Sequence, residues 1–331
     1  MKIMSSIKKI LIIQTAFIGD AILATAFAAS TKASFPNADV DFLLRKGNED
    51  ILNENGQIKN ILIWDKKKKW KSLFSLLKSV RKKKYDLLFL LQRFHTMAFF
   101  SFLSCAKITI GFDSSPLSIL FSKRIPHIIS RYGKEHEIKR NLKLLQHIDA
   151  NAKLKNPFLS LAQINLPEAK ETYITIAPSS VWATKQFPIE KWIEFIANIS
   201  IKEKIYLLGG PSDHGFLNRI YESFPKHNIY ILAGKLSLRE SAFLMKSAKM
   251  NFVNDSAPLH LASAVNAPVT AIFCSTVPEF GFGPLSDRGI VVQVDKEMDC
   301  RPCGIHGYKS CPKGHFNCAY DIPVTRLVEK I

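Results

Sequence analysis

The sequence predicts an α/β protein with two parallel sheets in tandem, one in each half of the chain. Its 331 residues exceed what one hydrophobic core usually serves and fit two domains. Both halves alternate short apolar runs with helical patterns, which is typical of βαβ units. Hydrophobic residues make up 47% and charged residues 22%, as in globular rather than disordered chains. The periodicity breaks near residues 151–170, so we expect domains over 1–160 and 161–331.

Each half supplies its own strands and helices. In the first half we expect strands at 9–14, 40–44, 61–64, 86–91 and 108–112, and helices at 21–35, 68–84 and 138–148. In the second half we expect strands at 173–178, 204–210, 229–234, 250–255 and 269–274, and helices at about 188–200, 212–224, 237–249 and 257–265. Two such sheets place ligands at the carboxyl ends of their strands, in a cleft between the domains.

The charge is strongly basic and unevenly distributed. The chain has 46 Lys and Arg against 28 Asp and Glu, a net charge of +18. Residues 1–165 hold 28 basic and 12 acidic residues (+16), whereas residues 166–331 hold 18 and 16 (+2). Such a field attracts nucleic acid, an acidic membrane surface or an acidic substrate. The simpler alternative is that lysines only cover solvated faces.

Nothing in the sequence predicts a membrane span or a cleaved leader. Arg93 and His95 interrupt the longest apolar run, which a spanning helix of about 20 residues would not tolerate. The N-terminus has the outline of a signal peptide, but Gln14 and Asp20 fall inside its apolar region. We therefore expect a cytoplasmic protein whose six cysteines are thiols or metal ligands rather than disulfides.

The most informative motif is Asn-Asp-Ser-Ala-Pro-Leu-His at 254–260, between an apolar strand and a helix. It offers the Asp255 carboxylate, the Ser256 hydroxyl, a helix N-terminus and, one turn later, His260. In a parallel sheet such a junction lies at the carboxyl edge, where phosphates bind. A lone helix histidine is otherwise most often structural.

Two further loops of the second half suit phosphate. The loop after the strand at 173–178 carries hydroxyl and ammonium groups: Ser179, Ser180, Thr184 and Lys185. Gly209 and Gly210 end the next strand and let the backbone approach a ligand closely. Taken singly, each loop is equally well explained as an ordinary turn.

The first strand ends without a dinucleotide fingerprint. Only Gly19 is present where G-x-G-x-x-G would stand, which argues against a nicotinamide-dependent oxidoreductase. Asp20 follows, and position alone leaves two interpretations open. It is either a charge that favours the helix N-terminus or a general base.

Together these segments resemble glycosyltransferase family 9, the ADP-heptose:lipopolysaccharide heptosyltransferases. The resemblance covers most of the chain in the family's order: residues 9–44, HEIKRNLKLL, the Ala-Pro-Ser loop up to Lys185 and Pro188, LLGGPSD, LAGKLSLRE and NDSAPLHLASAVNAPVTAIF. It implies a GT-B fold, in which two Rossmann-like domains face each other across a cleft. The N-terminal domain would bind the lipid-linked acceptor and the C-terminal domain the nucleotide-sugar donor.

The resemblance also implies roles for individual residues. Asp20 would be the catalytic base and Lys185 a contact of the donor phosphate. The other implied donor-site residues are Ser179, Ser180, Thr184, Gly209, Gly210, Asp255, Ser256, Ala257 and His260, with Glu240 or its neighbour Arg239 near the ribose. An inverting transfer needs one base and positive charge on the leaving diphosphate. We therefore expect no required cofactor or catalytic metal.

Some positions depart from the family or stay unexplained. Ala257 stands where the family has glycine, and the Cys274 side chain leaves less space for a diphosphate. Both departures leave open the alternative that this chain is a catalytically inactive relative of the family. A late cluster, Cys300, Cys303, Cys311 and Cys318, could hold structural zinc or an iron–sulfur cluster, or consist of reduced thiols or a regulatory disulfide.

The helix expected at 68–84 is basic, with Trp70, Phe74 and Val80 at helical spacing. We expect this helix to pack its apolar stripe on the sheet, to contact anionic lipid head groups, or to do both.

We conclude that the sequence encodes an inverting, metal-independent transferase. It would move heptose or a related sugar from a nucleotide-diphosphate sugar, with ADP-heptose as the expected donor, to an anionic lipopolysaccharide core acceptor. It would work as a peripheral protein on the cytoplasmic face of the inner membrane.

The alternative from another class is a basic nucleic-acid-binding protein. Its positive residues lack interleaved aromatic stacking positions, and no recognition motif appears. We therefore expect no nucleic-acid partner.

Overall fold

The chain forms two compact units. The computed structural model describes residues 6–200 and 202–331. One unit comprises Met1–Ile128 and Glu137–Ser160, and the other comprises Ile129–His136 and Leu161–Ile331. Each unit has its own sheet and its own hydrophobic core.

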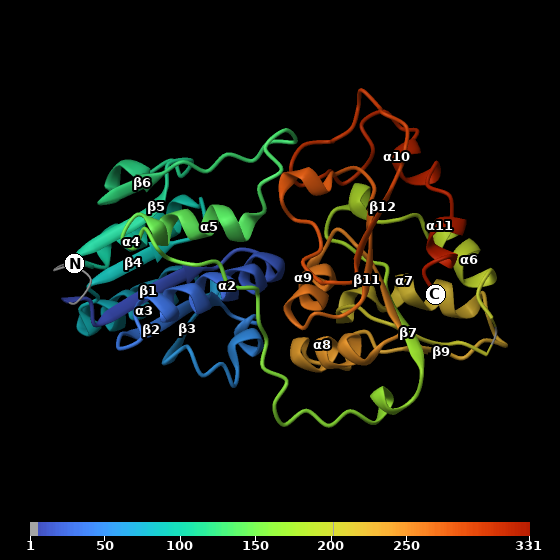
Figure 1. Ribbon diagram of the computed structural model, residues 1–331, viewed down its shortest axis with the longest axis horizontal. Helices are drawn as coiled ribbons and strands as arrows, with labels where there is room; N and C mark the ends of the chain where they lie inside the picture. The colour runs from blue at the N-terminus through green and yellow to red at the C-terminus, as the bar shows by residue number, and fades with distance from the viewer. Residues whose placement is uncertain (1–5, 201) are drawn as a thin grey trace. The chain divides into compact units, whose positions relative to one another are not determined.

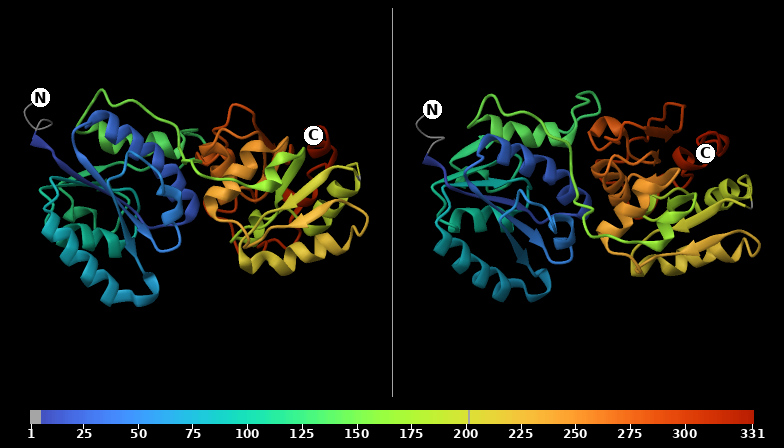
Figure 2. Two further views of the ribbon diagram at one scale, coloured as in Figure 1. Left: turned by 90° about the horizontal axis from the view of Figure 1, so that it is seen from below. Right: turned by 60° about the horizontal axis from the view of Figure 1, so that its bottom comes forward.

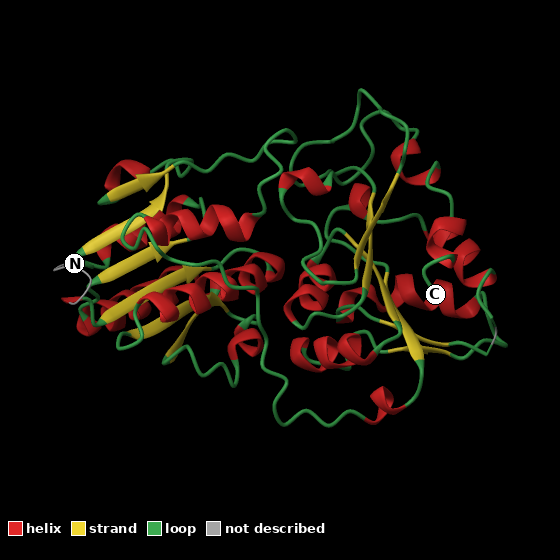
Figure 3. Cartoon of the chain, in the orientation of Figure 1, coloured by secondary structure: helices red, strands yellow, loops and turns green. Residues whose placement is uncertain are grey.

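The first unit is built on a six-stranded parallel sheet in the order β3-β2-β1-β4-β5-β6. Its strands are β1 (Lys9–Gln14), β2 (Asp39–Arg45), β3 (Asn60–Trp64), β4 (Leu87–Leu90), β5 (Ile108–Phe112) and β6 (Lys123–Ile125). Figure 3 shows these strands in yellow between the helices. The strand order reverses between β1 and β4, which is the place where ligands bind in such sheets.

Helices cover both faces of this sheet. They are α2 (Ile18–Ser34), α3 (Lys69–Lys83), α4 (His95–Leu103) and α5 (Glu137–Gln146). Helices α2 and α5 pack together on one face, and α3 and α4 lie on the other (Figures 1 and 2). Buried Leu76 and Val80 of α3 share one core cluster with Met97 and Phe100 of α4. Burial of these side chains holds both helices to the sheet.

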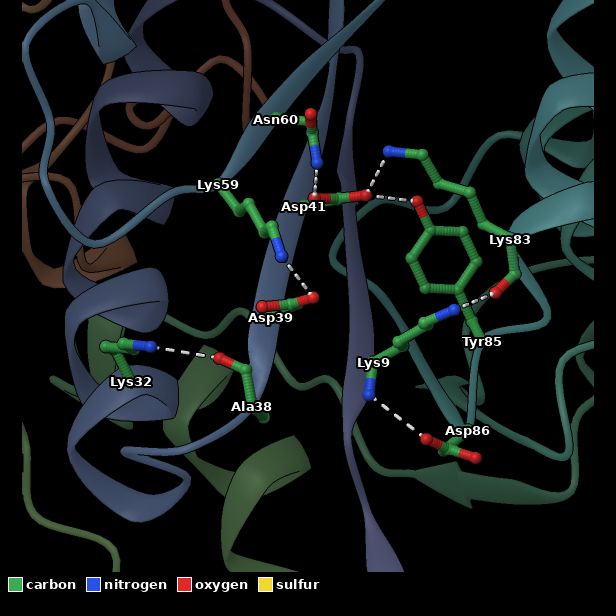
Figure 4. A network of polar contacts seen from close by, with 10 residues as sticks. All are labelled: Lys9, Lys32, Ala38, Asp39, Asp41, Lys59, Asn60, Lys83, Tyr85 and Asp86. Carbon is green, nitrogen blue, oxygen red and sulfur yellow. Dashed lines mark hydrogen bonds and ion pairs between the residues drawn. The ribbon is translucent and has the colours of Figure 1, made fainter.

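A polar network joins β2 and β3 to the segment before β4 (Figure 4). The buried carboxylate of Asp41 accepts hydrogen bonds from Tyr85 Oη at 2.6 Å and from Asn60 Nδ2 at 2.7 Å. Lys83 Nζ lies 2.6 Å from the same carboxylate. Burial, followed by the bond to Asp41, raises the pKa of Tyr85 above its usual value. The network compensates the buried negative charge of Asp41, and its bond to Lys83 fixes the C-terminal end of α3.

The second unit repeats the topology of the first, with the order β12-β11-β10-β7-β8-β9 and every pair parallel. Its strands are β7 (Tyr173–Ala177), β8 (Lys204–Leu207), β9 (Ile229–Ile231), β10 (Met250–Asn254), β11 (Val269–Phe273) and β12 (Gly289–Gln293). Its helices are α6 (Ile189–Ala197), α7 (His214–Glu222), α8 (Leu238–Ser247), α9 (Ala257–Ala264), α10 (Asn317–Tyr320) and α11 (Thr325–Val328).

The core of the second unit contains a group of packed aromatic rings and includes the chain's last helices. Phe195 of α6 packs against Trp192 of the same helix and against Phe252 of β10, and Cys318 and Leu327 join the same cluster. Helix α11 packs beside α6, while α8 packs beside α9. Because α9 starts directly after β10, its N-terminus stands at the carboxyl edge of the sheet.

The predicted α/β fold class is confirmed, and every expected strand and helix is present. Five of these helices and strands were not predicted: α4, β6, β12 and the short helices α10 and α11. Strand β6 has only three residues, two of them exposed, so it leaves no periodic signal. Helix α4 is hidden because apolar residues occupy both of its faces. Within the described part of the chain, no helix is long and apolar enough to cross a membrane.

Candidate functional site

The candidate site lies at the carboxyl ends of β7 and β10, where the Asn254 side chain forms hydrogen bonds with the loop after β7. Its Oδ1 accepts a hydrogen bond from Phe187 N at 3.0 Å, and its Nδ2 donates to Pro178 O at 2.6 Å. Asn254 is fully buried at the end of β10. It thus holds the loop after β7 against the start of the 254–260 motif. The sequence did not single out this role, although the residue belongs to the motif.

This arrangement brings together Lys185 and Asp255, two residues selected from separate motifs. Lys185 Nζ lies 2.6 Å from Asp255 Oδ2. Thr276 Oγ1 donates a second hydrogen bond, at 2.6 Å, to the same oxygen. Both side chains of the pair are largely buried, with 15% and 6% of their surfaces exposed. The pair presents a fixed cation at the strand ends, which suits a phosphate.

Thr184 connects three loops around this pair. Its Oγ1 accepts hydrogen bonds from Tyr308 N at 2.8 Å and from Ser275 Oγ at 3.0 Å, and donates to Tyr308 O at 3.3 Å. A side chain at Gly307 would place its Cβ 2.8 Å from the same oxygen. The Thr184 hydroxyl is therefore engaged within the protein and fixes the loop that carries Lys185. Ser275, Thr276 and Tyr308 belong to this site but were not selected from the sequence, because they are distant in the chain.

His260 lies one turn into α9, next to the ion pair. Burial is the main cause that lowers its pKa to about 3; nearby His136 and Lys185 lower it further, and Asp255 opposes the shift. The imidazole is therefore neutral at physiological pH. Its Nδ1 is buried without a hydrogen-bond partner among the described residues. Ser256 caps the start of α9 with its backbone, and its hydroxyl donates to Asn254 O at 3.4 Å.

The remaining donor-site candidates have clear structural contacts. Gly210 N donates to Asp213 Oδ2 at 2.8 Å, and a Cβ on Gly209 would approach that oxygen to 2.9 Å. Glu240 closes the capping box of α8, since Ser237 N donates to its Oε2 at 2.7 Å. Ala257 is the first residue of α9.

The two serines after β7 differ in their surroundings. The Ser179 hydroxyl is buried with no partner in the described structure. The Ser180 backbone oxygen accepts a hydrogen bond from Gln186 Nε2 at 2.5 Å. Ser179 therefore has an unused polar group, whereas Ser180 contributes to the shape of its loop.

Asp20 belongs to the first unit and lies in the first turn of α2. Its Oδ2 accepts a hydrogen bond from Phe17 N at 3.3 Å. The preceding strand end is fixed by a pair of hydrogen bonds between Thr15 and Gln92, which join β1 to β4 at the switch point. A carboxylate thus stands at the position where an open α/β sheet binds its ligand. The capping contact of Asp20 is compatible with both interpretations of this residue.

The late cysteines surround Arg301 without forming a metal site. All six cysteines are free thiols. Cys303 Sγ donates to Cys300 O at 3.2 Å, and burial is the main cause that raises the pKa of Cys318 to about 12. Across residues 6–200 and 202–331, no group of three or more His, Cys, Asp or Glu could hold a metal ion. The expectation of structural zinc at Cys300, Cys303, Cys311 and Cys318 is therefore unsupported.

Arg301 instead ties the tail to the strand ends beside the ion pair. Its Nε donates to Cys274 O at 2.7 Å, and its Nη2 donates to Thr276 O at 2.7 Å. A further bond from Nη2 reaches Gln293 Oε1 at 2.7 Å in β12. The tail thereby supports the loop that carries Thr276, which in turn holds Asp255.

The chain matches a family model and several characterised proteins. The model of glycosyltransferase family 9 (heptosyltransferase) covers residues 73–306. A lipopolysaccharide heptosyltransferase 3 of Escherichia coli is 28% identical over 279 residues, which cover 78% of this chain and 82% of that protein. A lipooligosaccharide heptosyltransferase 2 of Campylobacter jejuni is 24% identical over 332 residues, 98% of each chain.

Solved structures share the fold. The E. coli ADP-heptose lipopolysaccharide heptosyltransferase II superposes with a TM-score of 0.78 at 20% identity, and the superposition covers 97% of both chains. The E. coli heptosyltransferase WaaC with ADP gives 0.75 at 18% identity, with 97% of this chain and 99% of that one covered. An iron-containing dodecameric glycosyltransferase, TibC of E. coli, gives 0.61 at 14% identity and covers 98% of this chain and 75% of its own.

Proposed function

Because this chain belongs to glycosyltransferase family 9, we propose that it transfers a heptose from a nucleotide-diphosphate sugar to a lipopolysaccharide core acceptor. The chain is a glycosyltransferase with a GT-B fold. The observation that carries the proposal beyond the family is the Lys185–Asp255 pair beside the N-terminus of α9. A solved relative holds ADP, which supports an ADP-sugar as the donor.

The second unit supplies the charge that the donor's diphosphate requires. The Lys185 ammonium and the N-terminus of α9 both stabilise negative charge, which grows on the diphosphate as the sugar departs. Asp255 holds the ammonium in place, and the neutral His260 contributes no charge of its own. Transfer then needs no metal ion at the diphosphate.

The first unit supplies the base. The Asp20 carboxylate takes the proton of the acceptor hydroxyl while that oxygen attacks the anomeric carbon. The bond to the diphosphate breaks from the opposite face, so the product has inverted configuration. The +16 charge of residues 1–165 suits an anionic, phosphorylated glycolipid acceptor. Such an acceptor places the enzyme at a membrane surface, which we take to be the cytoplasmic face of the inner membrane.

The test is transfer from ADP-heptose to a defined core acceptor, followed by the mass of the product and the release of ADP. Asp20→Asn should lower kcat by about 100-fold or more, because general-base catalysis contributes roughly that factor, with little change in the Kd of ADP. Asp39→Asn, which removes an exposed carboxylate paired with Lys59, serves as the control and should keep wild-type turnover. Near-native turnover of the Asp20 variant would exclude this residue as the base.

A further inference from the structure

Helix α4 is apolar on its outward face as well as on its buried face. Met97, Ala98 and Phe100 are buried in the core of the first unit, whereas Phe99 and Phe102 are 47% and 51% exposed. A helix that is hydrophobic all round is normally buried on every side. The outward rings of α4 therefore require an apolar environment that the described residues around them do not supply.

Helix α3 exposes aromatic rings in the same way and surrounds them with positive charge. Trp70 and Phe74 are 64% and 66% exposed, lie one turn apart and have ring centroids separated by 6.5 Å. The segment 66–84 contains ten Lys and Arg and no Asp or Glu. Large exposed rings inside a positive field are typical of helices that lie in a membrane interface.

The two helices are connected at both ends, so their exposed rings belong to one surface. At the N-terminal ends, Lys66 Nζ lies 5.6 Å from the centre of the Phe94 ring. At the C-terminal ends, Arg81 Nε donates to Leu103 O at 2.6 Å. Figure 2 shows both helices on the same side of the first sheet. We call this surface the α3–α4 face; its exposed residues are Trp70, Phe74, Phe94, Phe99, Phe102, Lys67, Lys68, Lys71, Lys78 and Lys82.

We propose that the α3–α4 face docks the enzyme on a bilayer that contains anionic phospholipids. The aromatic rings enter the interface between head groups and acyl chains, and the lysines contact lipid phosphates. The proposal deepens the proposed function, since a lipid-linked acceptor lies in such a bilayer. It assigns the contact to two helices of the first unit and to specific side chains.

Charge and side-chain type favour a bilayer over other partners. A second copy docked through the same face would set lysines opposite lysines, because such an interface repeats one patch on both subunits. Exposed Trp70 and Phe74 do interleave with lysines, so the expectation that the basic residues lack aromatic stacking positions is wrong for this face. Ile119 distinguishes the two partners: it is 78% exposed in the 3₁₀ turn Ser118–Leu120 that packs beside α4, and it gains from contact with hydrocarbon but cannot stack on a nucleic-acid base.

Vesicle flotation of the full chain tests the proposal. We expect binding to vesicles of phosphatidylcholine mixed with phosphatidylglycerol, weak binding to phosphatidylcholine alone, and a loss of binding as salt rises. The paired change Trp70→Ser with Phe74→Ser, and separately Lys71→Glu with Lys78→Glu, should each lower the partition coefficient by about ten-fold or more. Circular dichroism and the thermal midpoint establish that each variant is folded.

Matched controls come from exposed residues of the second unit. Tyr221→Ser with Tyr320→Ser removes rings that are 46% and 45% exposed, and Lys226→Glu with Lys246→Glu reverses two exposed charges. Both control pairs should bind vesicles like the wild type. Equal losses in the controls and in the α3–α4 variants would overturn the proposal, because general charge or hydrophobicity would then explain the binding.

Quenching of tryptophan fluorescence by brominated acyl chains gives a second readout. Vesicles should quench the wild type, and Trp70→Phe should remove most of the quenching while the protein still binds. Undiminished quenching in that variant would overturn the docking geometry. So would α3–α4 variants that bind vesicles normally but lose self-association in sedimentation, or lose binding to a single-stranded oligonucleotide.

Transfer assays separate this proposal from the proposed function. The α3–α4 variants should keep wild-type kcat/KM on a water-soluble, delipidated acceptor and lose activity only on acceptor embedded in vesicles. Equal loss on both acceptors would contradict a docking role. If the wild type transfers heptose to neither acceptor, the proposed function fails, while the flotation result still decides the role of the α3–α4 face.

Discussion

At the scale of single residues, the structure changes the meaning of Lys185. The sequence indicated an ammonium group that contacts the donor phosphate, but the ammonium is held by the buried Asp255. A donor diphosphate must therefore share the ammonium with that carboxylate. Buried ion pairs often contribute little net stability, yet the loss of one partner is costly because the other charge stays uncompensated.

Lys185→Ala should weaken ADP binding at least ten-fold and lower the free energy of unfolding by about 3 kcal/mol, since it leaves the Asp255 carboxylate buried without its cation. Calorimetry with ADP and urea unfolding measure the two effects. The double change Lys185→Ala with Asp255→Asn should recover most of the stability but not the affinity. An unchanged Kd for ADP in Lys185→Ala would dismiss the phosphate contact.

His260 should make the free energy of unfolding decrease as the pH falls. The unfolded imidazole takes up a proton near pH 6.5, whereas the folded one stays neutral down to about pH 3. Between these values the unfolded state binds more protons, so stability is greatest above pH 6.5 and falls on acidification. From pH 7 to pH 5 this single group should cost about 2 kcal/mol.

Urea unfolding of the wild type and of His260→Gln at pH 7 and pH 5 measures this cost as a difference between the two proteins. The exposed His147→Gln is the control and should follow the wild type. An identical pH dependence in His260→Gln and the wild type would contradict this, because the imidazole would then have the same pKa in the folded and unfolded states.

At the scale of elements, strand and helix ends explain most of the candidate site. Gly210 and Asp213 close the turn after β8, and Ser237 and Glu240 close the start of α8. These contacts account for residues that the sequence assigned to the donor site by resemblance. A structural contact does not exclude ligand binding. Glu240 can therefore both close the capping box of α8 and contact the donor ribose, and the two roles need to be tested separately.

The capping box of α8 offers that separation. Ser237→Ala should lower the free energy of unfolding by about 1 kcal/mol, because the amide of Glu240 loses its cap. Glu240→Gln keeps the box, since glutamine caps as glutamate does. That variant should retain stability, and weaker ADP binding in it would then report a lost ribose contact. Ser247→Ala, near the other end of α8, is the control; a matching loss of stability there would argue against a specific cap.

Helix α4 was not predicted because its sequence lacks an amphipathic pattern. Pattern analysis detects a helix by one apolar and one polar face, and α4 has exposed rings where the polar face should be. Its amphipathic signal is lost, although the segment is helical. The same feature identifies α4 as part of the proposed membrane contact.

At the scale of the whole molecule, one topology serves two units of very different charge. Both sheets follow the same strand order, but nearly all the excess positive charge belongs to the first half of the chain. This division suits a lipid-linked anionic acceptor for one unit and a nucleotide sugar for the other. The assignment of acceptor to the first unit and donor to the second stays a proposal.

Transfer should be independent of divalent metal, because the ammonium of Lys185 and the N-terminus of α9 supply the charge that a metal would otherwise provide. Activity measured with and without a strong chelator should agree within error. A rate that falls with the chelator and returns with an added divalent ion would contradict this.

The sequence by itself determined the two α/β units, nearly all their strands and the family. Those features are encoded in local periodicity and in motifs read residue by residue. It also placed Asp255 and Lys185 at strand ends, because parallel strands share one carboxyl edge.

Only the tertiary structure decided that Lys185 and Asp255 form one buried pair, that Thr184 binds Ser275 and Tyr308, and that α3 and α4 share an exposed aromatic face. Contacts between residues so far apart in the chain depend on how the sheet brings its loops together. Exposure likewise depends on which neighbours cover a side chain, and local sequence pattern carries neither kind of information.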